Sequence, residues 1–356
     1  MKAILKYGKV LTLVILVILQ DTMFGQSQRE LELLSKRYTI YHTAFKNHIN
    51  VFRASYNDIR ANLNDKAPEL LDSIEYSFAS NSSANRAFSP TTGITMERVG
   101  KFIKVVDIQE QSQSYSAGVR NGHFIVSING VYPMHIKHAW GLLNEKKTIK
   151  LEILNGSVKR TVSFKTGWYV MKSVTLDINN RIATFKFHSL SNAMLNKYKE
   201  LSSAVRNDRI DTLVFDLRTI IGMGDIKAVL SVADQYINEN VDILEIATAT
   251  GMYTYTASGN TIVTDIPIKV IIDSTTWGHG LLLAGIFSTY TNAELIGSPT
   301  STDGKLYTIY KIQDSPAYFL RIPVQDYTIG EQVILHGRSL APKKQDGDKQ
   351  VYTANK

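Results

Sequence analysis

The residues best placed to do chemistry lie in a short turn between two apolar segments in the last third of the chain. Val270–Asp273 is predicted as a buried strand and Leu281–Phe287 as part of a buried helix, with Ser274–Gly280 between them. The first N–H groups of a helix have no intrahelical partner, so such a turn can stabilise an oxyanion beside a nucleophile. Hydroxyl groups at such a turn more often cap the helix than react. The polar side chains available are Ser274, Thr275, Thr276 and His279.

The segments around this turn predict an α/β core over residues 174–342. Ile182–Phe187 and Ile210–Phe215 have the composition of strands. Asn192–Val205 and Asp225–Asn238 have the apolar periodicity of helices. Because strands that alternate with helices are typical of a sheet covered by helices, we expect a mixed α/β (α+β) fold.

Two further units are predicted before the core. Residues 27–85 have a helical pattern that ends in a polar linker, and they are interpreted as a helical N-terminal segment. Residues 91–166 contain short strands, for example Phe102–Ile108 and Thr148–Leu154, and a helix from about Ile136 to Leu143. The last segment, residues 343–356, is a polar tail.

The first 25 residues have the pattern of a secretory signal peptide. Lys2, Lys6 and Lys9 precede the apolar run Val10–Leu19, and cleavage is expected near Gly25. That run is shorter than the ~20 residues that span a bilayer, so stable membrane insertion after cleavage is not expected; an uncleaved anchor is the alternative. With no cysteine for a lipobox or a disulfide, we expect an exported protein of a bacterial periplasm or a secreted one.

Composition excludes several classes of function. With 44% hydrophobic and 20% charged residues the chain is expected to be globular. Its formal net charge is +8, but Lys and Arg are scattered and no nucleic-acid-binding motif occurs, so no nucleic acid partner is expected. No spacing typical of metal ligands is present and there is no cysteine. We therefore expect no metal site and no cofactor.

Four segments, taken together and in this order, resemble the C-terminal processing (tail-specific) serine peptidases. The resemblance extends from Thr91 to Pro342, and in that family a Thr and an apolar or aromatic residue precede the catalytic Ser. Here Gly278 stands where the resemblance places that Ser, so it implies a degenerate nucleophile position. The four segments are Asp216-Leu217-Arg218, Thr276-Trp277-Gly278, Leu295–Thr300 and Gly337–Pro342.

The same resemblance suggests that two residues of the catalytic apparatus are retained in this chain. Gly222 matches a glycine whose backbone N–H helps to form the oxyanion hole, whereas the family's Asn position is Ile220 here. Lys305, in the wording Thr302-Asp303-Gly304-Lys305, is the candidate base if a two-residue insertion is allowed. A lysine acts as a base only if burial lowers its pKa, and a surface lysine is the commoner case. Asp216 and Arg218 are interpreted as a structural ion pair.

Residues 91–166 resemble a PDZ domain of the kind found in such peptidases, on the strength of Ser116–Ile125 and Asn129-Gly130. A PDZ domain holds a chain end by strand addition, with loop N–H groups on the terminal carboxylate. In the alternative interpretation the domain serves only for packing. The residues predicted to bind a peptide are Thr92, Gly93, Ile94, Thr95, Met96, Ala139 and Leu143.

These observations favour an exported, catalytically inactive peptidase homologue that binds peptides or unfolded protein C-termini. One alternative is an active serine endopeptidase that uses a displaced hydroxyl, since Ser274, Thr275 and Thr276 lie beside Gly278. A second alternative is a structural envelope protein that binds no peptide.

Overall fold

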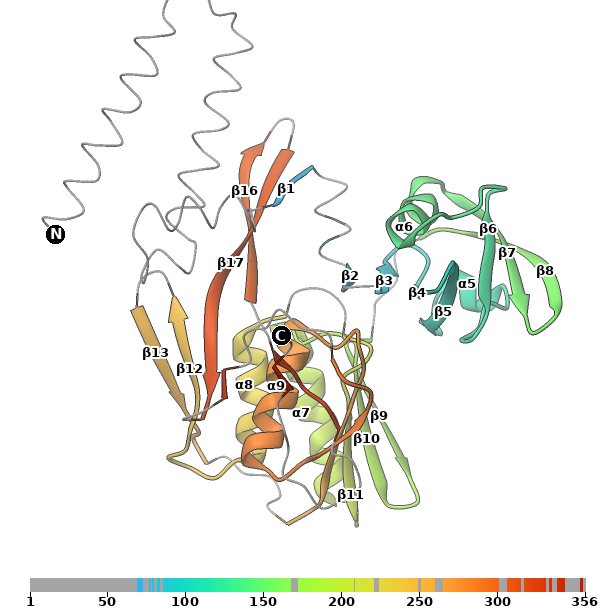
Figure 1. The fold of residues 1–356 in the computed structure, drawn as a ribbon. Helices are drawn as coiled ribbons and strands as arrows, with labels where there is room; N and C mark the ends of the chain where they lie inside the picture. The colour runs from blue at the N-terminus through green and yellow to red at the C-terminus, as the bar shows by residue number, and fades with distance from the viewer. Residues whose placement is uncertain are drawn as a thin grey trace, which may run out of the picture.

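The computed structural model describes two units that are built on sheets (Figure 1). The predicted signal peptide, most of the predicted helical segment and most of the polar tail lie outside the described residues. The described residues are 69–72, 77, 79, 82–83, 86–167, 172–207, 209–220, 224–248, 251–259, 265–300, 306–314, 317–330, 333–334, 338–342 and 353–354.

The first unit, which we call the small domain, is an antiparallel sheet with two helices. Its strand order is β2-β3-β4-β5-β6-β7-β8, and its helices are α5 (Gln113–Ser116) and α6 (Ile136–Glu145). Apolar residues of β4, β5, β6, β7 and α6 form its core. The strands are β2 (Ser82–Ser83), β3 (Arg86–Ser89), β4 (Ile94–Val99), β5 (Phe102–Ile108), β6 (Phe124–Ile128), β7 (Thr148–Asn155) and β8 (Val158–Lys165).

The second unit, the core domain, contains a five-stranded sheet in the order β15-β14-β11-β10-β9. Strands β10, β11, β14 and β15 run parallel, and β9 is antiparallel to β10. This mixed α/β arrangement confirms the predicted fold class. The elements are β9 (Val174–Asn179), β10 (Ile182–Phe187), α7 (Asn192–Asn207), β11 (Thr212–Asp216), α8 (Ile226–Ala233), η2 (Asp234–Tyr236), β14 (Ile268–Ile272), α9 (Gly278–Tyr290) and β15 (Glu294–Gly297).

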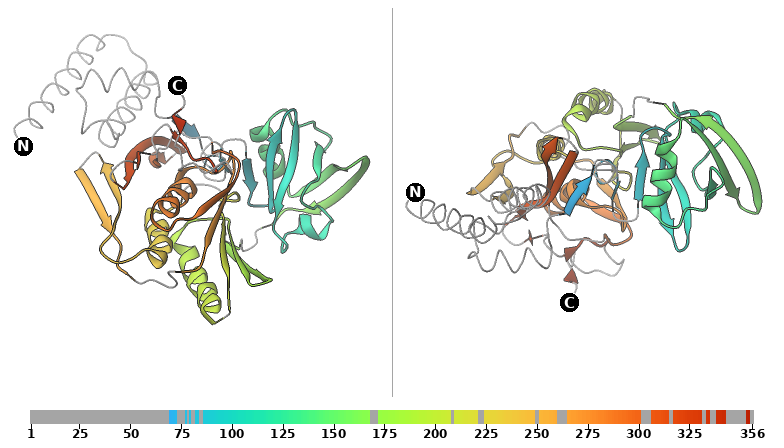
Figure 2. Two further views of the ribbon diagram at one scale, coloured as in Figure 1. Left: turned by 60° about the horizontal axis from the view of Figure 1, so that its bottom comes forward. Right: turned by 90° about the horizontal axis from the view of Figure 1, so that it is seen from above.

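A second, antiparallel sheet in the order β1-β17-β12-β13 lies on the other side of the helices, and β16 and β18 also pair with β17. Helix α9 packs between the two sheets, which explains why its residues Gly280–Ser288 are buried all round. The small domain and the pair β12–β13 lie at opposite ends of the molecule (Figure 2). The strands are β1 (Glu69–Asp72), β12 (Asp242–Thr248), β13 (Gly251–Thr256), β16 (Leu306–Asp314), β17 (Ala317–Ile329) and β18 (Val333–Ile334), and β19 (Arg338–Ser339) pairs with β20 (Thr353–Ala354).

Within the predicted helical segment 27–85 the structure describes residues 69–72, 77, 79 and 82–83, of which 77 and 79 are helical and the others are in strands. Residues 69–72 form β1, which pairs antiparallel with β17, and residues 82–83 form β2, which pairs with β3. Pairing with a strand far along the chain overrides the local helical pattern, because the preference of an isolated segment is weak compared with tertiary contacts. None of the described helices is both long and apolar enough to cross a bilayer.

Candidate active site

The parallel strands bring three segments of the chain to one edge of the core sheet. In the register of the sheet Lys186 on β10 pairs with Asp216 on β11, and Asp216 pairs with Ile271 on β14. The segments that follow these strands therefore start side by side. In open α/β sheets this carboxyl edge is where ligands bind.

The turn after β14 is held together by its own hydroxyl groups. The carboxylate Oδ1 of Asp273 accepts hydrogen bonds from the backbone N–H of Thr275 at 2.9 Å and from its Oγ1 at 2.6 Å. Thr276 Oγ1 accepts from the backbone N–H of Asp273 at 3.0 Å. Both threonines are 2% exposed. These two hydroxyls therefore stabilise the turn, as hydroxyls at helix starts commonly do.

Gly278 opens helix α9 with φ of +53°, in the left-handed region that favours glycine. A Cβ atom built there would meet no atom within 4 Å, so the position is open. The residue before it, Trp277, provides no side-chain cap for the helix. Among the described residues the N–H groups of Gly278 and His279 make no hydrogen bond. The helix therefore starts with free N–H groups beside a residue that has no nucleophilic side chain.

His279 follows Gly278 in helix α9 and packs against Gly224. Burial lowers its pKa to about 4, although nearby Asp225 acts in the opposite direction. It packs so closely on Gly224 that a Cβ there would lie 2.8 Å from its Cβ. At neutral pH the ring is therefore uncharged and a weak base.

Ile220 fills the space under the first turn of α9. Its side chain is 5% exposed, and its Cδ1 would lie 3.0 Å from a Cβ at Gly280. The resemblance places an Asn at this position in active peptidases. An apolar side chain here removes a polar group from the wall of the site. Gly222, the candidate oxyanion contributor, and Lys305, the candidate base, lie outside the described residues.

Asp216 and Arg218 form the structural ion pair that the sequence indicated. Arg218 donates from Nε to Asp216 Oδ1 at 2.9 Å and from its terminal nitrogen to Oδ2 at 2.7 Å. Its backbone N–H also donates to Asp216 Oδ1, at 3.1 Å. This bond with Asp216 raises the pKa of Arg218. The pair fixes the loop after β11.

Arg86 of the small domain reaches both loops of the site. Its guanidinium lies 2.6 Å from Glu97 Oε2 and 3.1 Å from Asp273 Oδ2, and it donates to the backbone carbonyl of Arg218. The side chain is 6% exposed. Sequence reasoning missed this residue, because nothing in its local pattern indicates burial between three segments.

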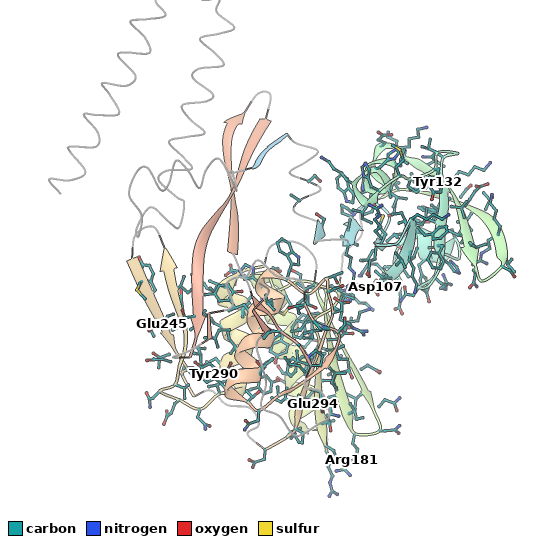
Figure 3. All side chains as sticks on the ribbon, viewed as in Figure 1. Asp107, Tyr132, Arg181, Glu245, Tyr290 and Glu294 are labelled. Atoms are coloured by element: carbon teal, nitrogen blue, oxygen red, sulfur yellow. The ribbon has the colours of Figure 1, made fainter. Side chains whose placement is uncertain are left out.

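A second contact joins the small domain to the carboxyl edge. Asp107 at the end of β5, which Figure 3 labels beside the core domain, lies 2.6 Å from the Nζ of Lys186 and 3.3 Å from the Nδ1 of His188. Asp107 and His188 have side chains that are 6% exposed. Burial lowers the pKa of His188 to about 4, against the opposite effect of Asp107. His188 is therefore neutral at pH 7 in the folded protein.

The seven residues predicted to bind a peptide do lie together, between β4 and α6, and all are buried. The groove that they were expected to line is not open, however, because β3 occupies it. In the antiparallel register Ala87 pairs with Met96 and Ser89 with Ile94. The indole N–H of Trp140 on α6 donates to the carbonyl of Phe88 at 2.9 Å.

The loop that was predicted to hold a terminal carboxylate also has an internal partner. The N–H groups of Thr92 and Gly93 both donate to the carbonyl oxygen of Ser89, at 3.3 and 2.8 Å. Gly93 adopts φ of +75°, which this turn requires. Segment β3 therefore fills the place of an added strand, which the sequence alone did not indicate.

No cluster of three or more His, Cys, Asp or Glu residues suitable for a metal ion occurs within the described part of the chain.

Comparison with known proteins identifies the family of the core domain. Residues 181–342 match the model of peptidase family S41. A curated protein, the "Probable CtpA-like serine protease" of Staphylococcus haemolyticus (strain JCSC1435), is 19% identical over 256 residues. That match covers 70% of this chain and 51% of the relative, so the chain spans about half the length of the curated protein.

Solved structures share the fold over most of the chain. The photosystem II D1 C-terminal processing protease matches with a TM-score of 0.58 at 16% identity, covering 89% of this chain and 92% of that one. A putative S41 protease from Bacteroides fragilis NCTC 9343 matches with a TM-score of 0.57 at 13% identity, covering 83% and 86%. The chain is therefore a homologue of the S41 serine peptidases, with its family S41 domain at residues 181–342.

Proposed function

We propose that this chain is an exported, non-hydrolytic S41 peptidase homologue that binds the C-terminal tails of peptides or unfolded proteins. The observation that carries the proposal is Gly278. It opens α9 at the carboxyl edge of the sheet, where the free N–H groups of the helix could stabilise an oxyanion, yet it has no atom that can attack a carbonyl. Removal of the nucleophile from a Ser-based apparatus abolishes nearly all of the chemistry.

The neighbouring side chains support the absence of hydrolysis. Thr275 and Thr276 are buried and bonded to Asp273, so their hydroxyls are engaged in the turn. Ile220, at the position where the resemblance places an Asn, puts an apolar side chain beneath the helix start. The competing function, an active endopeptidase with a displaced nucleophile, would have to break the hydrogen bonds of this turn before a threonine could react.

Tail binding is proposed for the small domain, at the edge of β4 that β3 now covers. A bound tail would replace β3 in the sheet, and its carboxylate would replace the carbonyl of Ser89 on the N–H groups of Thr92 and Gly93. A charged acceptor makes a stronger hydrogen bond than a neutral carbonyl, which favours the exchange. We expect dissociation constants of micromolar to tens of micromolar, roughly −6 to −8 kcal/mol.

The test of the catalytic part combines a substrate with a covalent probe. The purified chain is incubated with unfolded casein and, separately, with a serine-reactive fluorophosphonate. We expect neither cleavage nor labelling. Labelling that disappears on changing Ser274, Thr275 or Thr276 to Ala would establish the active alternative and overturn the proposal.

Export is tested by the N-terminus of the protein in its native host. The basic residues before Val10–Leu19 lead us to expect a mature chain that begins between Gln26 and Arg29. N-terminal sequencing of the envelope or secreted fraction measures this directly. An intact Met1 in the membrane fraction would instead establish an uncleaved anchor.

The structural alternative, an envelope protein that binds no peptide, also has an observation in its favour, since β3 fills the groove. Peptides that differ only in a free or an amidated C-terminus separate the two functions. Tail binding requires that amidation weakens the complex, because the loop N–H groups lose a charged partner. Equal binding of the two peptides, or none, would favour the structural function.

A further inference from the structure

Exposed apolar side chains gather at one end of the small domain. They come from the turn between β4 and β5 and from the loop after β6, and each is between 43% and 68% exposed. The other large exposed apolar residues of the described chain lie singly or in pairs on other elements. We call the gathered set the tip patch, and its members are Val99, Phe102, Val131, Tyr132 and Met134.

Contacts join the turn and the loop that carry the tip patch. The hydroxyl of Tyr132 donates to the backbone carbonyl of Lys101 at 3.1 Å, which joins the loop to the turn. The ring of Phe102 meets that of Phe124 edge-on, with centroids 5.9 Å apart. Val99 pairs with Phe102 across the turn. Contiguous exposed apolar surface of this kind marks an interaction site more often than scattered residues do.

The charged side chains in the turn between β4 and β5 and in the loop after β6 are all positive. The Nζ of Lys101 lies 5.4 Å from the ring centroid of Phe102, and the Nζ of Lys104 lies 5.8 Å from that of Phe124. Arg98 flanks the turn and donates from Nε to the carbonyl of Gly100 at 3.0 Å. No acidic residue occurs in residues 98–106 or in residues 124–144.

The carboxylates on the neighbouring strands are already neutralised. Glu97 is bound to Arg86 on the side of the core domain. Glu152 on β7 accepts from Ser127 at 2.8 Å and lies 3.1 Å from the Nζ of Lys159. The cations of the tip patch therefore have no carboxylate partner within the described residues, and they remain available to an external anion.

The position of the tip patch leaves it accessible while the small domain is docked on the core. Strand β5 begins at the tip patch with Phe102 and ends near Asp107, which contacts the core domain. A strand of that length spans about 20 Å. Figure 3 accordingly places Tyr132 on the part of the small domain that points away from the core, and Asp107 beside the core.

We propose that the tip patch docks the protein on an anionic phospholipid surface. Aromatic and aliphatic side chains between lysines suit the boundary of headgroups and acyl chains, where the rings enter the apolar region and the ammonium groups reach the phosphates. The cores of protein–protein interfaces, by contrast, are depleted in lysine. Each cation near such a surface contributes about fivefold in affinity.

Flotation with lipid vesicles tests the proposal. The chain of residues 26–356, which lacks the apolar leader, is mixed with vesicles of phosphatidylcholine alone or with phosphatidylglycerol added. We expect binding to the anionic vesicles to be at least about tenfold stronger than to the neutral ones and to weaken at high salt. Equal binding to both vesicle types, or binding to neither, would overturn the proposal.

Paired variants locate the contact. The double variants Phe102→Ser with Tyr132→Ser, and Lys101→Glu with Lys104→Glu, should each lose at least about tenfold in vesicle affinity. The matched controls are Met252→Ser and Lys199→Glu, an exposed apolar and an exposed basic residue of the core domain, and they should change affinity by less than about twofold. Because Lys104 is partly exposed and the other side chains are exposed, the fold is expected to survive, which circular dichroism checks. A loss as large in the controls would contradict the assignment.

The same variants distinguish a lipid surface from a second copy of the chain. Light scattering gives the molar mass of the wild-type protein and of the Phe102→Ser, Tyr132→Ser variant without lipid. The proposal requires the same mass for both. A wild-type dimer that the variant converts into a monomer would assign the tip patch to self-association and overturn the lipid proposal.

Discussion

The guanidinium of Arg86 lies 3.1 Å from the carboxylate of Asp273, and this contact ties the small domain to the turn that carries Gly278. Asp273 uses its other oxygen, Oδ1, to hold Thr275. One carboxylate therefore stabilises both the turn and the contact between the domains. Arg86 in turn contacts two loops of the core domain, because it also donates to the carbonyl of Arg218.

Removal of this guanidinium should destabilise the protein more than removal of a surface one. Arg86→Ala leaves Asp273 and Glu97, whose side chains are 21% and 22% exposed, without their cation. We expect the free energy of unfolding to fall by about 2–4 kcal/mol in urea titrations. Arg181→Ala, which breaks an ion pair with Asp211 that is about half exposed, is the control and should cost less than about 1 kcal/mol. Equal losses in the two variants would contradict the importance of the Arg86 contact.

Adding a hydroxyl at Gly278, where the resemblance places a nucleophile, should not give the protein peptidase activity. In Gly278→Ser the new Cβ meets no atom within 4 Å, so no clash opposes it. The φ of +53° should nevertheless lower stability by about 1–2 kcal/mol. We expect no fluorophosphonate labelling, since Ile220 still fills the space under the helix start.

Gly278→Asn is the matched control, because Asn tolerates the left-handed region better than Ser and should cost less. The unfolding midpoint in urea measures both variants. Labelling of Gly278→Ser that is lost on adding Lys305→Ala would show instead that a functional base survives in this chain.

Acid should weaken the fold through its buried histidines. The folded-state pKa of His188 is about 4, against an ordinary 6.5, because burial disfavours the charged ring. The unfolded chain therefore takes up a proton first, and the stability present above pH 6.5 is lost as the pH falls towards 4. The loss is on the order of 2–3 kcal/mol for this group.

Urea unfolding at pH 7, 5.5 and 4.5 (from about half a unit above to about two units below the ordinary histidine value) measures this dependence. His188→Gln should reduce the dependence of the unfolding free energy on pH by the contribution of this one group. His279→Gln should do the same, since burial also lowers the pKa of His279 to about 4. The groups that face His188 are Asp107, Lys186, Asp216 and Lys172, and they are unchanged in these variants. A His188→Gln variant with the wild-type slope would contradict the assignment.

Loosening β3 should expose the proposed site for tails. Phe88 is 4% exposed, and Phe88→Ala removes the largest apolar contact of this strand while the backbone acceptor for Trp140 remains. If β3 competes with the tail, the affinity for a free-carboxylate peptide should rise by about tenfold or more, because the fraction of open groove rises. Fluorescence anisotropy with a labelled peptide ending in three alanines, and with its amidated form, measures the effect. Unchanged affinity in Phe88→Ala would show that β3 does not cover the binding site.

Much of the core domain could be predicted from the sequence, because its strands and helices carry strong periodicity. β10 appears at Ile182–Phe187 as predicted, and α7 differs from the predicted helix only at its end. The turn at Gly278 was also found, because a continuous apolar strand and a buried helix flank it. Its positive φ and the open space around it depend on the path of the backbone, which composition does not reveal.

The features that were missed depend on partners far along the chain. β3 is a strand of four residues, and only pairing with β4 and contact with α6 define it. Without it, the sequence suggested an open groove at Ile94 and Leu143. Likewise Arg86 joins three segments, and no local pattern marks a buried arginine. Short elements and ion pairs between domains are therefore the least predictable parts of this molecule.

Because β3 is covalently attached beside β4, another chain must bind β4 with enough affinity to displace it. Through the turn of residues 90–93 this strand faces β4 at an effective concentration in the millimolar range or above, as for short tethers in general. An internal segment of another protein could accept hydrogen bonds from the loop N–H groups only through a neutral carbonyl, and the carbonyl of Ser89 already does this. A chain end offers a full negative charge. The proposed tail site would therefore discriminate the ends of polypeptides from their internal segments.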